Sequence, residues 1–394
     1  MNVSVIGLGK AGLPLAAVIA DAGIKVMGVD IDKQKAASIN AGKNPLPEEP
    51  GLGALIRKHG GQNLKATIDG VMAARLCKHH IIIVPLFIDE KKQPDFSLIK
   101  KALAILGKGL KKKDTVIIET TMPIGTTETL IKSNLERESG LRAGKDFYLA
   151  YSPERIMTGY SISRYREFPK LIAGIDAAST EKAFSLYRAF SNPIKVSNAR
   201  TAEFAKVAEG IYRDVNIALA NELYKITESH DIDFWEMREA AKHEYCNILE
   251  PGNVGGHCIP VYPWFVINAH EVPLIKTARM VNDAMAEYYV NKIKLLKPKK
   301  VGIIGLSYRE GVREKAYARS IAVIKLLKEE GYDVYGLDPL YSKDEIKNNF
   351  SIKYLGDFKK MDAIMLLNKE QRYRKLLMPI KDRVIDVKGV LRSK

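Results

Sequence analysis

Val3-Ser4-Val5-Ile6-Gly7-Leu8-Gly9-Lys10-Ala11-Gly12 carries the strongest fold signal in the sequence. Its first four residues are mostly β-branched, as in a buried strand, and its three glycines form a GxGxxG turn. Leu13 to Ala22 is then small and apolar, like a buried helix, and a second strand-like run, Lys25 to Val29, stops at Asp30. Strand, glycine turn, helix and strand within about 30 residues predict a βαβ unit that binds a dinucleotide.

Each conspicuous residue of this unit has a physical role in such a site. Gly7 permits the tight turn, Gly9 lets the backbone approach a pyrophosphate, and Gly12 lets the helix pack closely on the strand. Asp30 can accept hydrogen bonds from both ribose hydroxyls and would repel a 2′-phosphate, so NAD is favoured over NADP. The alternative is a glycine turn that is purely structural and binds nothing.

Farther along, strand-like runs at residues 81–84, 115–119 and 147–151 alternate with helical stretches. This alternation predicts a parallel sheet covered on both faces. After Pro298 the chain repeats its own beginning weakly: a strand at 301–306 contains Gly305, and a later strand, 333–337, stops at Asp338. The sequence therefore predicts an α/β protein with two Rossmann-like, doubly wound domains.

Between these domains the periodicity becomes helical. A long helix is predicted from Thr201 to about Ser229 and a second from about Ile275 to Leu296. Apolar residues recur in the first at three- and four-residue spacing, namely Phe204, Val207, Ala208, Ile211, Val215, Ala218 and Leu219. We expect an NAD-binding domain at 1–198, a helical connector and dimerisation domain at 199–297, and a Rossmann-like domain at 298–394.

Bulk composition narrows the function class. The formal net charge is +16, but the basic residues are dispersed, so an anion-attracting surface is favoured over nucleic-acid binding. Three cysteines are too few for a disulfide framework. No apolar run is long enough to span a bilayer and no secretory signal is evident, so we expect a cytoplasmic protein. His79-His80 is adjacent and isolated, and we interpret it as a surface pair rather than a metal site.

The second chemical signal is Gly255-Gly256-His257-Cys258-Ile259-Pro260. A cysteine in a glycine-rich loop is open to a substrate carbon, and a nearby cation or helix amide would increase its thiolate fraction. On composition alone, a small core hydrophobe is the commoner role for a lone cysteine.

Five separated blocks resemble the UDP-glucose/GDP-mannose dehydrogenase family over nearly the whole chain. They are residues 5–9, Thr120 to Glu128, Tyr151 to Arg155, Arg213 to Leu223 and Gly255 to Pro260. Residues 151–155, 213–223 and 263–265 look most like the UDP-N-acetylmannosamine dehydrogenase branch, so the expected substrate is a UDP-N-acetylhexosamine.

The resemblance implies oxidation of a C6 alcohol to a carboxylate with two NAD molecules used in succession. Cys258 would trap the aldehyde as a thiohemiacetal that is oxidised to a thioester and hydrolysed. Lys206 would stabilise the C6 oxyanion, Glu154 would act as acid and base, and Thr121 would position water. Lys206 could instead be a solvated helical lysine, and His243 a surface histidine.

The glycine turn and the resemblance together predict two sets of binding residues. Cofactor contacts are expected at Gly7, Gly9, Lys10, Ala11, Gly12, Asp30, Lys35, Pro85 and Thr121. Substrate contacts are expected at Arg155, Ile156, Lys206, Arg213, His243, Gly255, Arg279 and Arg309, and Arg279 could reach a neighbouring subunit. The partners implied are a UDP-sugar and a second copy of the chain, held through the helical domain, without nucleic acid or membrane.

The chain also departs from the family's usual pattern. It has Gly210 where asparagine is usual four residues after the lysine, and Tyr262 where aspartate is usual four residues after the cysteine. Leu86 replaces a threonine, Arg309 a lysine, and Ala316 an arginine. These changes leave open a 6-dehydrogenase for another sugar, such as UDP-N-acetylglucosamine or UDP-glucose, or a homologue that binds nucleotide sugars with impaired turnover.

Overall fold

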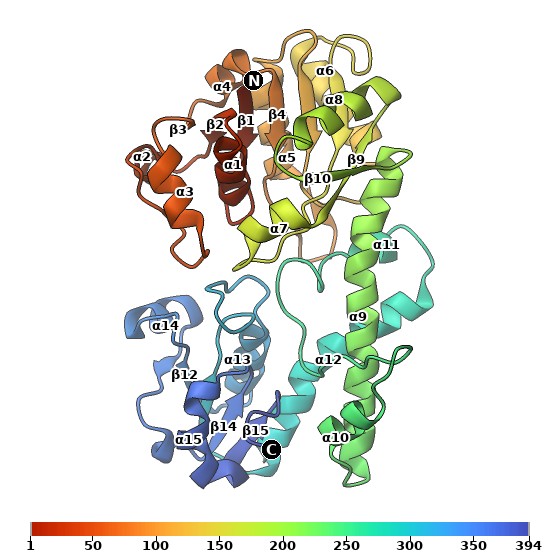
Figure 1. Cartoon of the computed structure of the whole chain (residues 1–394). Helices are drawn as coiled ribbons and strands as arrows, with labels where there is room; N and C mark the ends of the chain where they lie inside the picture. Colours follow the sequence, from red (N-terminus) through yellow and green to blue (C-terminus); the bar gives the residue numbers. More distant parts are fainter. Residues whose placement is uncertain (1, 393–394) are drawn as a thin grey trace. The chain divides into compact units, whose positions relative to one another are not determined.

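The computed structural model describes residues 2–392 and divides into two compact units, one up to Ala208 and one from Glu209 onward (Figure 1). Helix α9 (Ala199–Ser229) begins in the first unit and ends in the second. Within residues 2–392, no helix is long and apolar enough to cross a membrane.

The first unit is built on an eight-stranded sheet of order β10-β9-β8-β7-β4-β1-β2-β3. Its strands are β1 (Asn2–Ile6), β2 (Lys25–Val29), β3 (Leu64–Thr67), β4 (His79–Ile82), β7 (Thr115–Ile118), β8 (Tyr148–Tyr151), β9 (Pro169–Gly174) and β10 (Asn192–Lys195); β5 (Phe87–Ile88) and β6 (Pro94–Asp95) form a separate hairpin. Neighbouring strands are parallel except β8 and β9. Strands β2 and β3 are added on one side of β1, and β4 and β7 on the other, so the strand order reverses between β1 and β4. Open α/β sheets bind their ligands at such a switch point.

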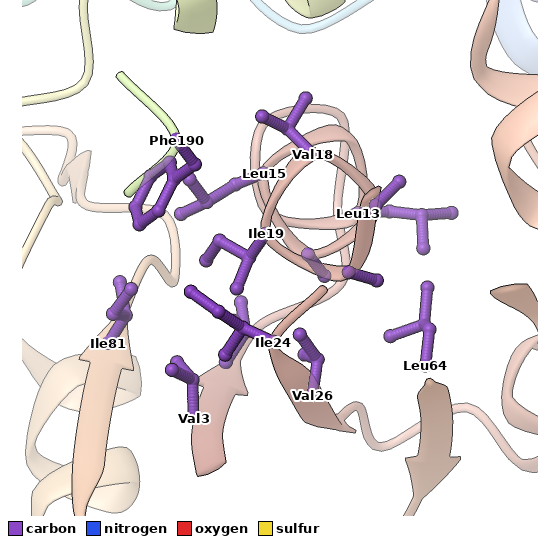
Figure 2. Packing of buried hydrophobic residues seen from close by; sticks show 14 of the residues in the cluster. Val3, Leu13, Leu15, Val18, Ile19, Ile24, Val26, Leu64, Ile81 and Phe190 are labelled. Carbon is purple, nitrogen blue, oxygen red and sulfur yellow. The ribbon is translucent and has the colours of Figure 1, made fainter. Parts of the chain in front are cut away.

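Helices cover both faces of this sheet, as predicted. They are α1 (Gly12–Asp21), α2 (Lys33–Asn40), α3 (Leu52–His59), α4 (Gly70–Leu76), α5 (Ser97–Gly107), α6 (Lys132–Ser139), α7 (Ser161–Glu167) and α8 (Ala177–Tyr187), with a π-helical turn, η1 (Thr127–Ile131), before α6. Residues of α1 and α8 form one core with Val3 and Val5, whereas α4, α5 and α6 form a second core with Ile6 and Ile82. Figure 2 shows Ile19 of α1 above Val3 in the first of these cores.

The second unit contains a five-stranded parallel sheet of order β13-β12-β11-β14-β15. Its strands are β11 (Lys300–Ile304), β12 (Asp333–Leu337), β13 (Lys353–Tyr354), β14 (Ala363–Leu366) and β15 (Val384–Asp386). Its helices are α10 (Phe234–Ala240), α11 (Trp264–Ile267), α12 (Pro273–Leu295), α13 (Arg319–Glu329), α14 (Lys343–Phe350) and α15 (Arg374–Leu377), with 3-10 turns η2 (Phe358–Lys360), η3 (Gln371–Tyr373) and η4 (Met378–Arg383).

The weak repeat in the sequence corresponds to a structural repeat. The amide of Gly7 donates to the carbonyl of Val29 at 2.9 Å, and the amide of Gly305 donates to that of Leu337 at 2.9 Å. The predicted α/β class with two Rossmann-like sheets is therefore confirmed.

Two expectations about individual residues are corrected. His80 is fully buried in β4, where its ring contacts the Ser4 hydroxyl at 2.8 Å and the Asp114 carboxylate at 3.3 Å, so the pair is not a surface feature. Burial also lowers the pKa of His79 to about 4. On α9, Phe204 and Leu219 are about half exposed and do not share the buried face with Val207.

Candidate active site

The glycine turn leaves space where a diphosphate would have to approach. A Cβ atom on Gly9 would meet no heavy atom within 4 Å. At Gly7, by contrast, φ is +103° and a Cβ would lie 2.8 Å from the Ile83 carbonyl oxygen. A Cβ at Gly12 would lie 1.8 Å from the Gly7 carbonyl oxygen. Gly7 and Gly12 are thus required by packing, and Gly9 keeps the backbone accessible. Lys10 and Ala11 complete this turn.

Asp30 lies at the end of β2, beside the turn. One carboxylate oxygen accepts a hydrogen bond from the Leu8 amide at 3.1 Å and contacts the Lys35 ammonium at 2.8 Å. The other accepts from the Asp32 amide at 3.0 Å. These contacts fix the carboxylate where a ribose would lie, and together with the open Gly9 they fit NAD.

The buried carboxylate of Glu203 links the segment that contains Thr121 to the helix that contains Lys206 by hydrogen bonds. Glu203, one turn before Lys206 on α9, is fully buried and accepts hydrogen bonds from the Gly125 amide and from the amide and hydroxyl of Thr127. Burial raises the pKa of Glu203. The loop that follows Thr121 is therefore fixed to the helix that carries Lys206, a connection the sequence did not predict.

The same loop is joined to the end of β4. The hydroxyl of Thr120 donates to the Val84 carbonyl oxygen at 2.6 Å, next to Pro85 and Leu86. Thr121 is buried, at 7% exposure. The predicted cofactor residues Pro85 and Thr121 therefore lie on two adjacent loops at the carboxyl edge of the sheet.

Glu154 interacts electrostatically with a buried ionic cluster. The Lys170 ammonium contacts the Glu119 carboxylate at 2.6 Å and the Pro153 carbonyl oxygen at 2.9 Å, and the Tyr187 hydroxyl donates to Glu119. Burial raises the pKa of Glu119 and lowers that of Lys170. Glu154 lies close enough to act on both of these pKa values.

Arg155 and Ile156 follow on this loop. The Arg155 guanidinium donates to the Pro169 carbonyl oxygen at 2.8 Å, and the Ile156 amide donates to the Glu154 carboxylate. Lys206 is buried, at 8% exposure, and its charge also acts on Lys170. Glu154 and Lys206 are therefore both neighbours of the same buried lysine, and Lys206 is not a solvated surface residue.

Cys258, in the second unit, is exposed, whereas Cys77 is buried and burial raises its pKa to about 11. The loop before Cys258 is fixed by close packing: a Cβ on Gly255 would lie 2.7 Å from the Tyr317 carbonyl oxygen, and one on Gly256 would lie 2.9 Å from the Tyr308 ring. The amide of Gly256 donates to the Tyr317 carbonyl at 3.1 Å. Cys258 is thus presented on a rigid loop and is not a core residue.

After Cys258 the backbone turns. The Val261 and Tyr262 amides donate to the Cys258 carbonyl oxygen at 3.1 and 2.9 Å. The Tyr262 hydroxyl then lies 3.3 Å from the Cys258 sulfur. The four-residue spacing of these side chains was visible in the sequence, although their contact was not predicted.

Arg279 is fully buried on α12 and is paired within its own chain. Its guanidinium contacts the carboxylate of Asp214, and one nitrogen lies 3.5 Å from the Ile259 carbonyl oxygen. Asn282 donates to the same carboxylate at 2.8 Å. This placement makes Arg279 a support for the cysteine loop, and its reach toward a neighbouring subunit stays a prediction.

The remaining expected substrate residues of the second unit are more open. Arg213 and His243 are exposed, and the His243 ring accepts a hydrogen bond from the Tyr245 amide at 3.1 Å. Arg309 is half-buried, with its guanidinium 5.8 Å from the centre of the Tyr308 ring. Tyr308 is also the ring against which Gly256 packs, so Arg309 and the cysteine loop share a neighbour.

Comparison with known proteins shows which protein family the chain matches. The NAD binding domain of the UDP-glucose/GDP-mannose dehydrogenase family matches residues 1–191, its central domain residues 200–284, and its UDP binding domain residues 302–393. The three matches cover most of the chain.

Individual relatives agree over their full length. A UDP-N-acetyl-D-mannosamine dehydrogenase of Campylobacter jejuni is 35% identical, with 98% of each chain covered, and an NDP-N-acetyl-D-galactosaminuronic acid dehydrogenase of Ralstonia solanacearum is 32% identical, with 100% of this chain and 97% of the relative covered. The solved UDP-D-ManNAc dehydrogenase of Pyrococcus horikoshii superimposes with a TM-score of 0.91 at 28% identity, covering 100% of this chain and 97% of that one. The chain therefore belongs to the UDP-glucose/GDP-mannose dehydrogenase family of NAD-dependent oxidoreductases that act on nucleotide sugars, and it carries that family's UDP binding domain.

Proposed function

We propose that this enzyme oxidises the C6 alcohol of a UDP-N-acetylhexosamine, UDP-N-acetylmannosamine in the first instance, to the uronic acid. The observation that carries the proposal is Cys258, an exposed thiol on a rigid glycine loop. A dehydrogenase that stopped at the aldehyde would have no use for a nucleophile there. The choice of sugar is supported by the relatives named for UDP-N-acetyl-D-mannosamine.

The residues of the chain fit the two oxidations in sequence. NAD supplies the hydride acceptor for both. Removal of hydride from C6 gives an aldehyde, and addition of the Cys258 thiolate gives a thiohemiacetal whose C–H bond is suited to a second hydride loss. Water then hydrolyses the resulting thioester, and the sulfur leaves as thiolate.

Three residues of the first unit assist these steps in the proposal. The Lys206 ammonium stabilises the negative charge that develops on the C6 oxygen. Glu154 exchanges protons with the substrate and with the attacking water, and Thr121 orients that water. Burial of Lys206 and Thr121 supports the assignment, because charge stabilisation is strongest where water is excluded.

A second candidate substrate is a nucleotide-linked N-acetylgalactosamine. It is favoured by relatives in Ralstonia at 32% and 35% identity, close to the identities of the mannosamine enzymes. The two sugars differ in configuration at ring carbons, and the exposed Arg213 and His243 are the side chains we propose to discriminate between them.

We also propose that the active enzyme is a homodimer formed through the helical region. Tyr212, Leu219 and Ile226 recur at seven-residue spacing on α9 and are 67%, 50% and 54% exposed. A row of half-exposed apolar side chains along one helix is typical of a subunit interface. Tyr212→Glu combined with Leu219→Glu should halve the mass measured by sedimentation, and an unchanged mass would contradict the assignment.

The test of the function is a panel of substrates. Purified enzyme is mixed with NAD and, separately, UDP-N-acetylmannosamine, UDP-N-acetylgalactosamine, UDP-N-acetylglucosamine and UDP-glucose, and the absorbance of NADH is followed. We expect the highest kcat/KM with UDP-N-acetylmannosamine and no uronic acid from Cys258→Ala. Saturable binding of a nucleotide sugar without NADH would instead identify a homologue with impaired turnover.

A further inference from the structure

The two departures from the family's usual pattern, Gly210 and Tyr262, touch each other. A Cβ atom on Gly210 would lie 2.7 Å from Cδ2 of the Tyr262 ring and 3.2 Å from its Cβ. The second of these atoms is next to the backbone and cannot swing away. Any side chain at 210 therefore excludes the observed position of the tyrosine, and the two substitutions are one coupled change.

The coupled change places the Tyr262 hydroxyl next to the Cys258 sulfur. Tyr262 is 8% exposed, its ring fills the space above Gly210, and its hydroxyl oxygen is 3.3 Å from the Cys258 sulfur. The turn that joins the two residues is closed by the 2.9 Å hydrogen bond from the Tyr262 amide to the Cys258 carbonyl. Ring packing and backbone together restrict the hydroxyl to this place.

We propose that Tyr262 is a catalytic residue whose hydroxyl donates a hydrogen bond to the Cys258 sulfur and stabilises its thiolate form. A tyrosine hydroxyl carries its proton at neutral pH, so toward a thiolate it acts as donor. The proposal rests on the proposed function in one respect, that Cys258 is the nucleophile. The two positions where asparagine and aspartate are usual thus together place one tyrosine hydroxyl beside the sulfur.

The hydroxyl serves two steps of the reaction. When the thiolate adds to the C6 aldehyde, a sulfur–carbon bond forms, the carbonyl π bond breaks with its electron pair moving to oxygen, and that oxygen takes a proton from Glu154. When water attacks the thioester, the oxygen of water bonds to C6, water gives a proton to Glu154, the sulfur–carbon bond breaks, and its electron pair returns to sulfur. The hydrogen bond from Tyr262 is strongest to sulfur as thiolate, at the start of the first step and the end of the second, and the tyrosine keeps its proton throughout.

The test is alkylation of the cofactor-free enzyme by iodoacetamide from pH 5 to pH 10, with modification of Cys258 followed by mass spectrometry. All variants carry Cys246→Ser so that the half-buried Cys246 does not compete. Tyr262→Phe keeps the ring against Gly210 and removes only the hydroxyl. We expect the pH midpoint of its alkylation to rise by about one unit and the rate at pH 7 to fall about fivefold to tenfold.

Tyr289→Phe is the matched control. Tyr289 is a fully buried tyrosine on α12 whose hydroxyl has no hydrogen-bond partner within residues 2–392, so its removal should leave the profile of Cys258 unchanged. Superimposable profiles for the parent and Tyr262→Phe would overturn the proposal, as would a parent midpoint at or above about 8.5, the value of an ordinary free cysteine. The second outcome is independent of how the variant folds.

Alkylation needs neither NAD nor sugar, so its result does not depend on the substrate assignment. A shifted profile in an enzyme that oxidises none of the four nucleotide sugars would retain the role of Tyr262 and reject the proposed function. An unshifted profile in an active dehydrogenase would do the reverse.

Discussion

Replacing Gly210 with alanine should destabilise the protein even though glycine is the poorer helix former. In the interior of α9, exchange of glycine for alanine normally gains about 1 kcal/mol. Here the added methyl group would lie 2.7 Å from the Tyr262 ring, and overpacking of this kind costs about 1–3 kcal/mol. With the middle of that range, the net loss is about 1 kcal/mol, or an apparent melting temperature lower by about 2–4 °C.

The same substitution should have the opposite sign when the ring is absent. In a Tyr262→Gly background neither the ring nor its Cβ opposes the new methyl group, so Gly210→Ala should raise the melting temperature by about 2–4 °C. The assay is differential scanning calorimetry of the parent, both single variants and the double variant, which gives the coupling between the sites. An equal effect of Gly210→Ala in both backgrounds would refute the argument that the tyrosine and the glycine depend on each other.

Three further predictions concern other groups. Lys170→Met leaves the buried carboxylate of Glu119 without its cation and should cost about 3–5 kcal/mol of unfolding free energy in chemical denaturation, and a loss below about 1 kcal/mol would contradict the cluster's role. Burial lowers the pKa of Lys388 from 10.5 to about 7, so between these pH values the unfolded chain holds one proton more than the folded chain and the free energy of unfolding rises with pH. Relative to Lys388→Met, the free energy of unfolding of the parent should increase by about 2 kcal/mol from pH 7 to pH 9 in urea titrations. A difference between the two proteins that does not change with pH would contradict the shift. Asp30→Ser should raise the KM for NAD about tenfold and, because the Lys35 ammonium loses its partner, increase the ratio of kcat/KM for NADP to that for NAD; steady-state kinetics with both cofactors decides this.

The elements around the glycine turn could be predicted because their signals are local. Strand periodicity, the GxGxxG spacing and the aspartate at the strand end place β1, α1 and β2 within one residue of their observed bounds. The strand β4 begins two residues earlier than predicted because His79 and His80 are polar in sequence but buried in structure. Asp114, the partner that makes burial of His80 possible, is 34 residues away and is not detectable by periodicity.

The candidate site could be predicted only as far as its motifs extend. The cysteine loop and the segment carrying Glu154 were assigned because each belongs to a recognisable block, and Lys206 was assigned from the family resemblance. Glu203, which fixes the Thr121 loop to α9, was missed because a buried glutamate in a helix has the same sequence appearance as a solvated one. The contact of Tyr262 with Cys258 had a signal, the four-residue spacing, but its significance depends on the space left by Gly210.

The most direct test of the proposed four-electron oxidation is the amount of NADH formed per sugar consumed. A limiting quantity of UDP-N-acetylmannosamine is incubated with excess NAD until absorbance stops rising, and the product is identified by mass spectrometry. We predict two NADH per sugar and a uronic acid, with Cys258→Ala forming none of the acid. One NADH per sugar with release of the aldehyde by the parent enzyme would contradict the role assigned to Cys258.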